Sequence, residues 1–154
     1  VTSDRDMKLA LSGMPFTFLP FDFDKGMDKV SCFAQGSDNI TSGYIINIIS
    51  IEFESEKNAL AYMDISNLDA NELQDISAEY TEYSISYDKG NKNGTEYVVC
   101  AVTDDQNDTV WHFGVYQCEK FVYAIVTVDI NTTKGIREAE RICEKLDIVS
   151  PSEA

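Results

Sequence analysis

The sequence is poor in the residues that most often carry chemistry. It holds one histidine, His112, and one tryptophan, Trp111, which are adjacent in the stretch DTVWHFGVY. A Ser-His-Asp triad or a Cys-His pair would therefore depend on His112, and no G-x-S-x-G elbow accompanies it. The glycine patterns that bind dinucleotides or the phosphates of ATP are missing as well. We expect that the protein is not an enzyme and has no cofactor.

Basic residues are also scarce, because 12 lysines and arginines stand against 27 acids and leave a net charge of −15. Such a field repels a nucleic acid or an anionic membrane surface, so neither is an expected partner. No apolar run is long enough to cross a bilayer. The acids are scattered along the chain, which favours a role in solubility over a dedicated cation site.

The four cysteines lie far apart and form no C-x-x-C pair, so a structural zinc site is not expected. Their even number allows two disulfides or buried free thiols, and the sequence leaves both open. The stretch DDQNDTVWHFGV has acids at EF-hand spacing, but Thr109 stands where glycine is needed and Val115 where glutamate is needed. It predicts a turn, with no metal site. The cysteines are Cys32, Cys100, Cys118 and Cys143.

Hydrophobic periodicity predicts one α+β domain over residues 8–149, between a flexible tether at 1–7 and a tail at 150–154. The apolar run 44–53 is typical of an inner strand, and the four later strands are joined by short turns, as in an antiparallel meander. Strands are expected at 8–12, 16–20, 30–33, 44–53, 79–88, 95–103, 109–118 and 121–129, and helices after Ser55, from Asp69 to Ile76 and after Thr133.

The stretches LALSGMPFTFLP, VWHFGVYQCEKFVYAIVTV and IREAERICEKLDIV stand in an order that resembles the Mog1/PsbP-like sandwich. That resemblance implies about six antiparallel strands with helices on both faces of the sheet. Its bacterial members are often extracytoplasmic lipoproteins, so it implies a secreted or surface protein, with any lipid anchor upstream of Val1. The alternative is the helix-grip fold, which has six strands after its helix pair, whereas four are expected there in this chain.

Short loops after residues 103 and 118 fix an expected register for the meander, in which Val102 opposes Trp111 and His112 opposes Thr127. Side chains alternate along strands, so two surfaces separate. The first, called the apolar face, is expected to lie under the terminal helix, with Cys100 near Cys143. The apolar face holds Val98, Cys100, Val102, Trp111, Phe113, Val115, Ala124, Val126 and Val128. The second surface is called the tyrosine face. It holds Tyr83, Ile85, Tyr87, Tyr97, Val99, His112, Gly114, Tyr116, Tyr123, Ile125 and Thr127.

The tyrosine face suits either packing under the helix pair or contact with a ligand. If it binds a ligand, Tyr97, Tyr116 and Tyr123 supply the contact area and His112 tunes it. The sequence therefore predicts an extracytoplasmic binding or interaction domain for a protein or a cell-wall component. The alternative is a carrier that holds a small ligand in an internal apolar cavity.

Overall fold

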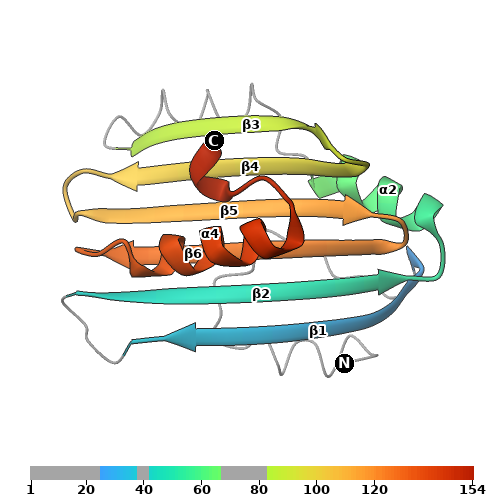
Figure 1. The fold of residues 1–154 in the computed structure, drawn as a ribbon, viewed down its shortest axis with the longest axis horizontal. Helices are drawn as coiled ribbons and strands as arrows, with labels where there is room; N and C mark the ends of the chain where they lie inside the picture. Colours follow the sequence, from blue (N-terminus) through green and yellow to red (C-terminus); the bar gives the residue numbers. More distant parts are fainter. Residues whose placement is uncertain (1–24, 38–41, 67–82) are drawn as a thin grey trace.

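The structure, a computed structural model, describes residues 25–37, 42–66 and 83–154. In this part of the chain one antiparallel sheet runs in the order β1-β2-β6-β5-β4-β3, with helices on both faces (Figure 1). The α+β class and the six strands confirm the expected fold class. The elements are β1 Met27–Gly36, β2 Gly43–Phe53, α2 Glu56–Ser66, β3 Tyr83–Lys92, β4 Thr95–Asp104, β5 Thr109–Cys118, β6 Phe121–Ile130, α4 Lys134–Leu146 and the 3-10 turn η2 Pro151–Glu153.

The register of β4, β5 and β6 is the one that the loop lengths predict. Val102 opposes Trp111, and His112 opposes Thr127. The loop after Asp104 spans 105–108, and β6 begins directly after Glu119 and Lys120. Because each pair shares a side of the sheet, the apolar and tyrosine faces of these three strands are confirmed.

The expected faces of β3 are wrong. Asn93 and Gly94 alone form the turn to β4, with φ of 53° and 87°, and Lys92 opposes Thr95. A two-residue Asn-Gly turn is the usual connection of a tight hairpin, and it extends the strand beyond the loop expected at 89–93. The longer strand moves its tyrosines and isoleucine to the apolar face, where Tyr83 opposes Asp104, Ile85 opposes Val102 and Tyr87 opposes Cys100.

The terminal helix α4 covers the tyrosine face, and its expected place on the apolar face is wrong. The physical cause lies at the helix start, where Asp129 of β6 accepts hydrogen bonds from the backbone N–H groups of Gly135 at 2.8 Å and Ile136 at 2.9 Å. Asp129 shares its side of the strand with Thr127, so this cap binds the helix to the tyrosine face. Thr133, the expected cap, makes no side-chain capping bond. Ile136, Ala139 and Cys143 pack there with Ile46, Val99, Tyr116, Ile125 and Val149.

Helix α2 covers the apolar face at one end of the sheet. Ser55 accepts a bond from the Asn58 N–H at 3.2 Å, as expected of its N-cap. Phe53 ends β2 on the apolar face and its ring lies 5.4 Å from that of Tyr62. In Figure 1, α2 lies behind the sheet at the end where β2 finishes, and α4 lies in front of it. The cluster around α2 holds Met27, Val30, Ile49, Ile51, Phe53, Ala59, Tyr62, Met63, Val98, Val115, Val122, Ala124 and Val126.

Strand β1 covers ten residues, where the sequence predicted a short strand at 30–33. Other expectations fall outside the described residues: the strands at 8–12 and 16–20, and the helix from Asp69 to Ile76. Among the helices that are described, none is long and apolar enough to cross a membrane.

Candidate functional site

The three predicted ligand tyrosines form one row across the tyrosine face. Tyr97 opposes Tyr116, and Tyr116 opposes Tyr123, so the row crosses β4, β5 and β6 in adjacent positions. His112 lies on the same face of β5, four residues before Tyr116, with Gly114 between them. The structure therefore brings the three tyrosines together and places His112 farther along the strand.

Tyr116 is fully buried under the C-terminal part of the chain. Its hydroxyl donates a hydrogen bond to the Val149 carbonyl oxygen at 2.7 Å and lies 3.9 Å from the Cys143 Sγ. Its ring lies over Gly114, where an added Cβ would collide with the phenol. Burial raises the pKa of the Tyr116 hydroxyl, with a smaller contribution from Cys143. A buried and bonded phenol of this kind holds the fold together, and any contact with a ligand would require Val149 to move.

Tyr97 and Tyr123 lie at the two ends of the row and are both half-buried. The Tyr97 hydroxyl donates to Asp88 Oδ2 at 3.0 Å, and this bond raises the pKa of the phenol. The Tyr123 ring stacks on Phe121, with centroids 6.2 Å apart and planes inclined at 19°. Both tyrosines also pack against the cluster beneath α4. Ligand contact by these residues stays a prediction.

His112 is half-buried between β4 and β6, opposite Ala101 and Thr127. Its Nδ1 and the Thr127 Oγ1 are buried, and neither has a hydrogen-bond partner among the residues that the structure describes. Burial lowers the pKa of the imidazole, while the carboxylates of Asp129 and Glu140 act in the opposite direction. The structure therefore favours a neutral imidazole whose cross-strand neighbours are alanine and threonine.

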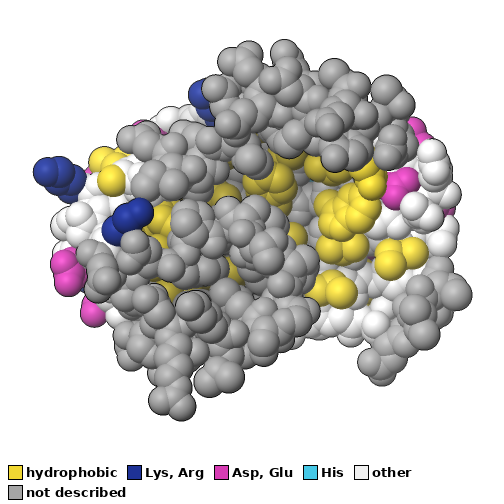
Figure 2. Space-filling view, turned by 180° about the vertical axis from the view of Figure 1, so that it is seen from behind, with side chains coloured by type: hydrophobic (Ala, Val, Ile, Leu, Met, Phe, Trp, Pro, Cys, Tyr) yellow, Lys and Arg dark blue, Asp and Glu magenta, His cyan; other side chains and the backbone are white. Residues whose placement is uncertain are grey.

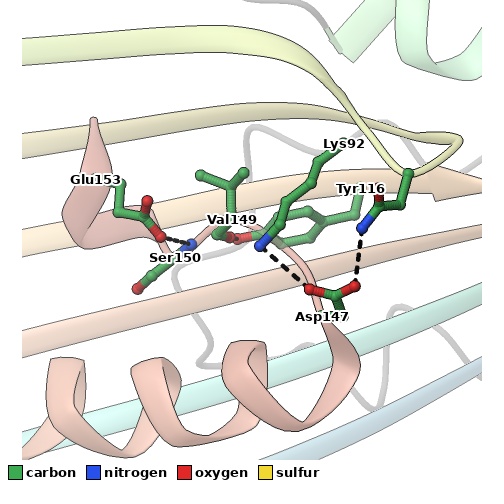
Figure 3. A network of polar contacts seen from close by, with 7 residues as sticks. Lys92, Tyr116, Asp147, Val149, Ser150 and Glu153 are labelled. Carbon is green, nitrogen blue, oxygen red and sulfur yellow. Dashed lines mark hydrogen bonds and ion pairs between the residues drawn. The ribbon is translucent and has the colours of Figure 1, made fainter.

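Figure 3 shows the polar contacts that the C-terminal segment makes with the β3–β4 hairpin and within itself. Asp147 receives a hydrogen bond from Asn93 Nδ2 at 2.9 Å and an ion pair from Lys92 Nζ at 3.4 Å. Ser150 and Glu153 then form a reciprocal capping box that begins η2. The Asp147 contacts join the β3–β4 hairpin to the end of α4. The middle of the tyrosine row is closed by the bond from Tyr116 to Val149.

The sequence did not predict a partly exposed apolar surface that lies on the other side of the sheet. Five apolar side chains stand opposite one another across β3, β4, β5, β6 and β2, and we call this line the Trp111 row. Four of them are half-buried and Ile45 is 45% exposed. The row consists of Ile85, Val102, Trp111, Val128 and Ile45.

Burial of the apolar face falls with distance from α2. In the row nearer to α2, Val98, Val115, Ala124 and Ile49 are all buried. In the next row, Cys100 and Val126 are still buried and Phe113 is half-buried. Figure 2, which views this side, shows hydrophobic side chains at the surface over part of the sheet. Among the described residues, helix α2 packs on one end of this face, and the Trp111 row lies at the other end.

Trp111 also contacts a residue that the sequence had placed on the opposite face. Its ring meets that of Tyr83 edge to face, with centroids 6.3 Å apart and planes at 72°. Trp111 was expected to point into the core, and in the structure it is half-buried. The Asn93–Gly94 dipeptide is the sequence signal for a two-residue turn, and that turn places Tyr83 on the same face as Trp111.

All four cysteines are free thiols, and the expected approach of Cys100 to Cys143 is wrong. Cys100 faces the apolar side of the sheet together with Phe113, whereas Cys143 of α4 lies on the tyrosine side. Burial raises the pKa of each of these two thiols to about 11. No group of three or more histidine, cysteine or acidic side chains that could hold a metal ion occurs within the described ranges.

Comparison with known proteins identifies no family for this chain. No protein-family model matches the chain, and no curated protein does either. Among solved structures, the extracellular domain of PknH from Mycobacterium tuberculosis is similar over 80% of this chain and 66% of that one, at 12% identity and a TM-score of 0.49. The resemblance to the Mog1/PsbP-like group thus stays a prediction.

Proposed function

We propose that this chain is a non-enzymatic, extracytoplasmic interaction domain that binds a protein or a cell-wall component through the Trp111 row. The observation that carries the proposal is the row itself, five apolar side chains in register across five strands with Ile45 45% exposed. A contiguous apolar surface with an aromatic residue at its centre is the usual anatomy of a binding patch.

The surroundings of the chemistry-bearing residues support the non-enzymatic part of the proposal. His112 faces alanine and threonine across its two neighbouring strands. The buried thiol of Cys100 lies on the opposite side of the sheet from His112. Catalysis by a histidine requires a nucleophile or an acid within hydrogen-bond reach, and the described residues offer none at Nδ1.

The extracytoplasmic part of the proposal rests on the order of elements, which resembles that of the Mog1/PsbP-like sandwich. It is tested by expressing the full gene in its source cell and adding protease to intact cells. Digestion of the protein, with a cytoplasmic marker left intact, is the expected result. Protection of both proteins until the cells are lysed would overturn this part.

A carrier for a small apolar ligand is the second candidate, because the Trp111 row is apolar enough to hold one. A carrier needs a closed pocket, whereas Ile45 at one end of the row is open to solvent. This exposure favours a macromolecular partner, which can cover a flat surface.

The binding surface can be tested with a photo-crosslinking amino acid, benzoylphenylalanine, at position 45. The matched control carries it at Ser86, an exposed position of β3 on the tyrosine side of the sheet. We expect covalent adducts with a protein or with isolated cell wall from position 45 and not from position 86. The purified partner should then change the fluorescence of Trp111. Equal adducts from both positions, or none from position 45, would count against the proposal.

A further inference from the structure

The turn between β3 and β4 consists of an asparagine followed by a glycine, Asn93 and Gly94. No other asparagine of the chain precedes a glycine. An asparagine loses its side-chain amide when the backbone nitrogen of the next residue attacks its Cγ atom. Glycine permits this attack most readily, because it has no Cβ that obstructs the approach. Asn93 is therefore the asparagine of this sequence at which spontaneous deamidation is most favoured.

The same turn is accessible to the water that deamidation consumes. Asn93 and Gly94 are both exposed and have left-handed backbone, with φ of 53° and 87°. A Cβ added at Gly94 would meet no atom within 4 Å, so the space beside the turn is open.

The amide of Asn93 also holds the β3–β4 hairpin to the end of α4. Its Nδ2 donates a hydrogen bond to Asp147 Oδ2 at 2.9 Å. Lys92 Nζ lies 3.4 Å from Asp147 Oδ1, as Figure 3 shows. Asp147 is the C-cap of α4. A carboxylate at position 93 could not donate this bond and would repel the carboxylate of Asp147.

We propose that Asn93 is a site of self-modification, which converts to aspartate or isoaspartate and thereby loosens the end of α4 from the β3–β4 hairpin. The Gly94 backbone nitrogen gives up its proton to water and bonds to the Asn93 Cγ. The Cγ–Nδ2 bond then breaks, and the nitrogen leaves as ammonia with a proton from water. The cyclic imide that remains adds one water molecule at either of its two carbonyl carbons. Opening at one carbon gives aspartate and at the other isoaspartate, and no oxidant or reductant takes part.

Two hydrogen bonds of the folded protein oppose this reaction. The Gly94 N–H, which supplies the attacking nitrogen, donates to Asn91 Oδ1 at 3.1 Å. The amide that leaves is held by Asp147. Both bonds are exposed, and exposed polar contacts are individually weak, so they slow the reaction without preventing it. Loss of ammonia makes the conversion irreversible, so the contact with Asp147 is lost progressively with time.

The chemical step is tested by incubating the purified protein in mildly alkaline buffer and mapping its peptides by mass spectrometry. We expect conversion at Asn93 that is slower than in a synthetic peptide of the sequence GNKNGTEY. Asp147→Gly removes the acceptor of the amide and suits the φ of 54° at this position, so it should speed the conversion. Asn93→Gln is the matched control, because glutamine would have to form a larger ring and should not convert in the same time.

Two results would overturn the chemical step. One is a protein that stays unconverted at Asn93 while the free peptide converts completely. The other is a protein in which a different asparagine converts first. A rate that Asp147→Gly leaves unchanged would overturn the role of Asp147 in restraining the amide.

The structural consequence is tested with Asn93→Asp, which carries the product carboxylate from the start. Trypsin cleavage after Lys145, an exposed residue in the last turn of α4, reports local opening there. It should be about two- to fivefold faster than in the parent protein, as expected for the loss of an exposed polar contact.

Asn91→Asp is the matched control for this measurement. It adds the same charge to the same hairpin and keeps an oxygen that accepts from the Gly94 N–H. Position 91 also faces the opposite side of the sheet from Lys92, so cleavage after Lys145 should match the parent protein. Circular dichroism would show that both variants keep the fold. Equal cleavage of Asn93→Asp and the parent protein would overturn the proposed loosening of α4. None of these outcomes bears on the Trp111 row, which lies on the apolar face.

Discussion

The hydroxyl of Tyr116 donates a hydrogen bond of 2.7 Å to the carbonyl oxygen of Val149, 33 residues later in the chain. This bond joins the middle of the sheet to the segment that follows α4. Both residues belong to the cluster beneath α4, and Tyr116 has no exposed surface. The contact explains why a tyrosine that looks suitable for ligand contact in the sequence is part of the core.

Tyr116→Phe keeps the ring and removes only this hydroxyl, so it leaves the Val149 carbonyl without its donor. Losing the partner of a buried acceptor typically costs about 1–3 kcal/mol of the free energy of unfolding. The control is Tyr97→Phe, whose exposed bond to Asp88 should be worth less than about 0.5 kcal/mol. Urea denaturation of the two variants measures both values. Equal losses would show that the Val149 bond does not stabilise the fold.

Asp129→Asn should destabilise the protein more than a change at the cap that the sequence predicts. The carboxylate accepts from the N–H groups of both Gly135 and Ile136, and an amide offers only one oxygen for the two donors. We expect a loss of about 1–3 kcal/mol in the free energy of unfolding. Thr133→Ala should change it by no more than about 0.5 kcal/mol, because Thr133 makes no capping bond. The reverse order of the two losses would contradict the structure.

The meander could be predicted because its loops are short and their lengths fix which residues oppose one another. Once Thr103 is set opposite Val110 and Cys118 opposite Phe121, every other pair of β4, β5 and β6 follows. The placement of β3 failed for a local reason. Its turn is Asn93–Gly94 and not the longer loop, which changes the face of every side chain on the strand.

The side of the sheet that α4 covers could not be predicted from hydrophobic patterns, because both faces are apolar enough to accept its stripe. Asp129 decides between them, and its role depends on a tertiary contact with Gly135 and Ile136. For the same reason the tyrosine row was predicted correctly, but the helix α4 that covers it was expected on the apolar face. The lower burial of the Trp111 row could not be predicted either, because it depends on the placement of α2 near Phe53 at the other end of the apolar face.

Trp111→Ala should cost less stability than a comparable truncation near α2. Phe53 is 1% exposed and packs against Tyr62, so Phe53→Ala should cost about 3–5 kcal/mol in the free energy of unfolding. Trp111 is half-buried at the end of the apolar face away from α2, so its truncation should cost less than about 3 kcal/mol. Chemical denaturation compares the variants, and acrylamide should quench Trp111 fluorescence in the native protein. An unquenched Trp111 with the larger loss would place it in the core.

The cysteines should divide into two classes toward a thiol reagent. Cys32 and Cys118 are exposed, whereas Cys100 and Cys143 are buried. Burial raises the pKa of the latter two to about 11, so both access and thiolate formation are suppressed. Ellman's reagent should react with two thiols in the native protein and with four in denaturant. Cys118 should react before Cys32, whose pKa is raised by burial. Rapid reaction of all four thiols would contradict the burial of Cys100 and Cys143.

His112 should make the protein less stable as the solution becomes acidic. Burial lowers the pKa of its imidazole in the folded state below the ordinary value of 6.5. The unfolded chain then binds the proton more readily, so stability is fully present above pH 6.5 and is lost as the pH falls through the folded pKa. Acidic residues titrate as well, so the informative quantity is the difference between the parent protein and His112→Gln.

We expect His112→Gln to cost little stability above pH 6.5, where a neutral polar group replaces a neutral imidazole whose Nδ1 has no partner among the described residues. Below that pH the variant should lose less stability than the parent, because it has no buried imidazole whose protonation favours the unfolded chain. Urea denaturation at two pH values on either side of 6.5 measures this difference. A parent protein that gains stability on acidification relative to His112→Gln would mean that Asp129 and Glu140 outweigh burial, and that His112 is held as a cation.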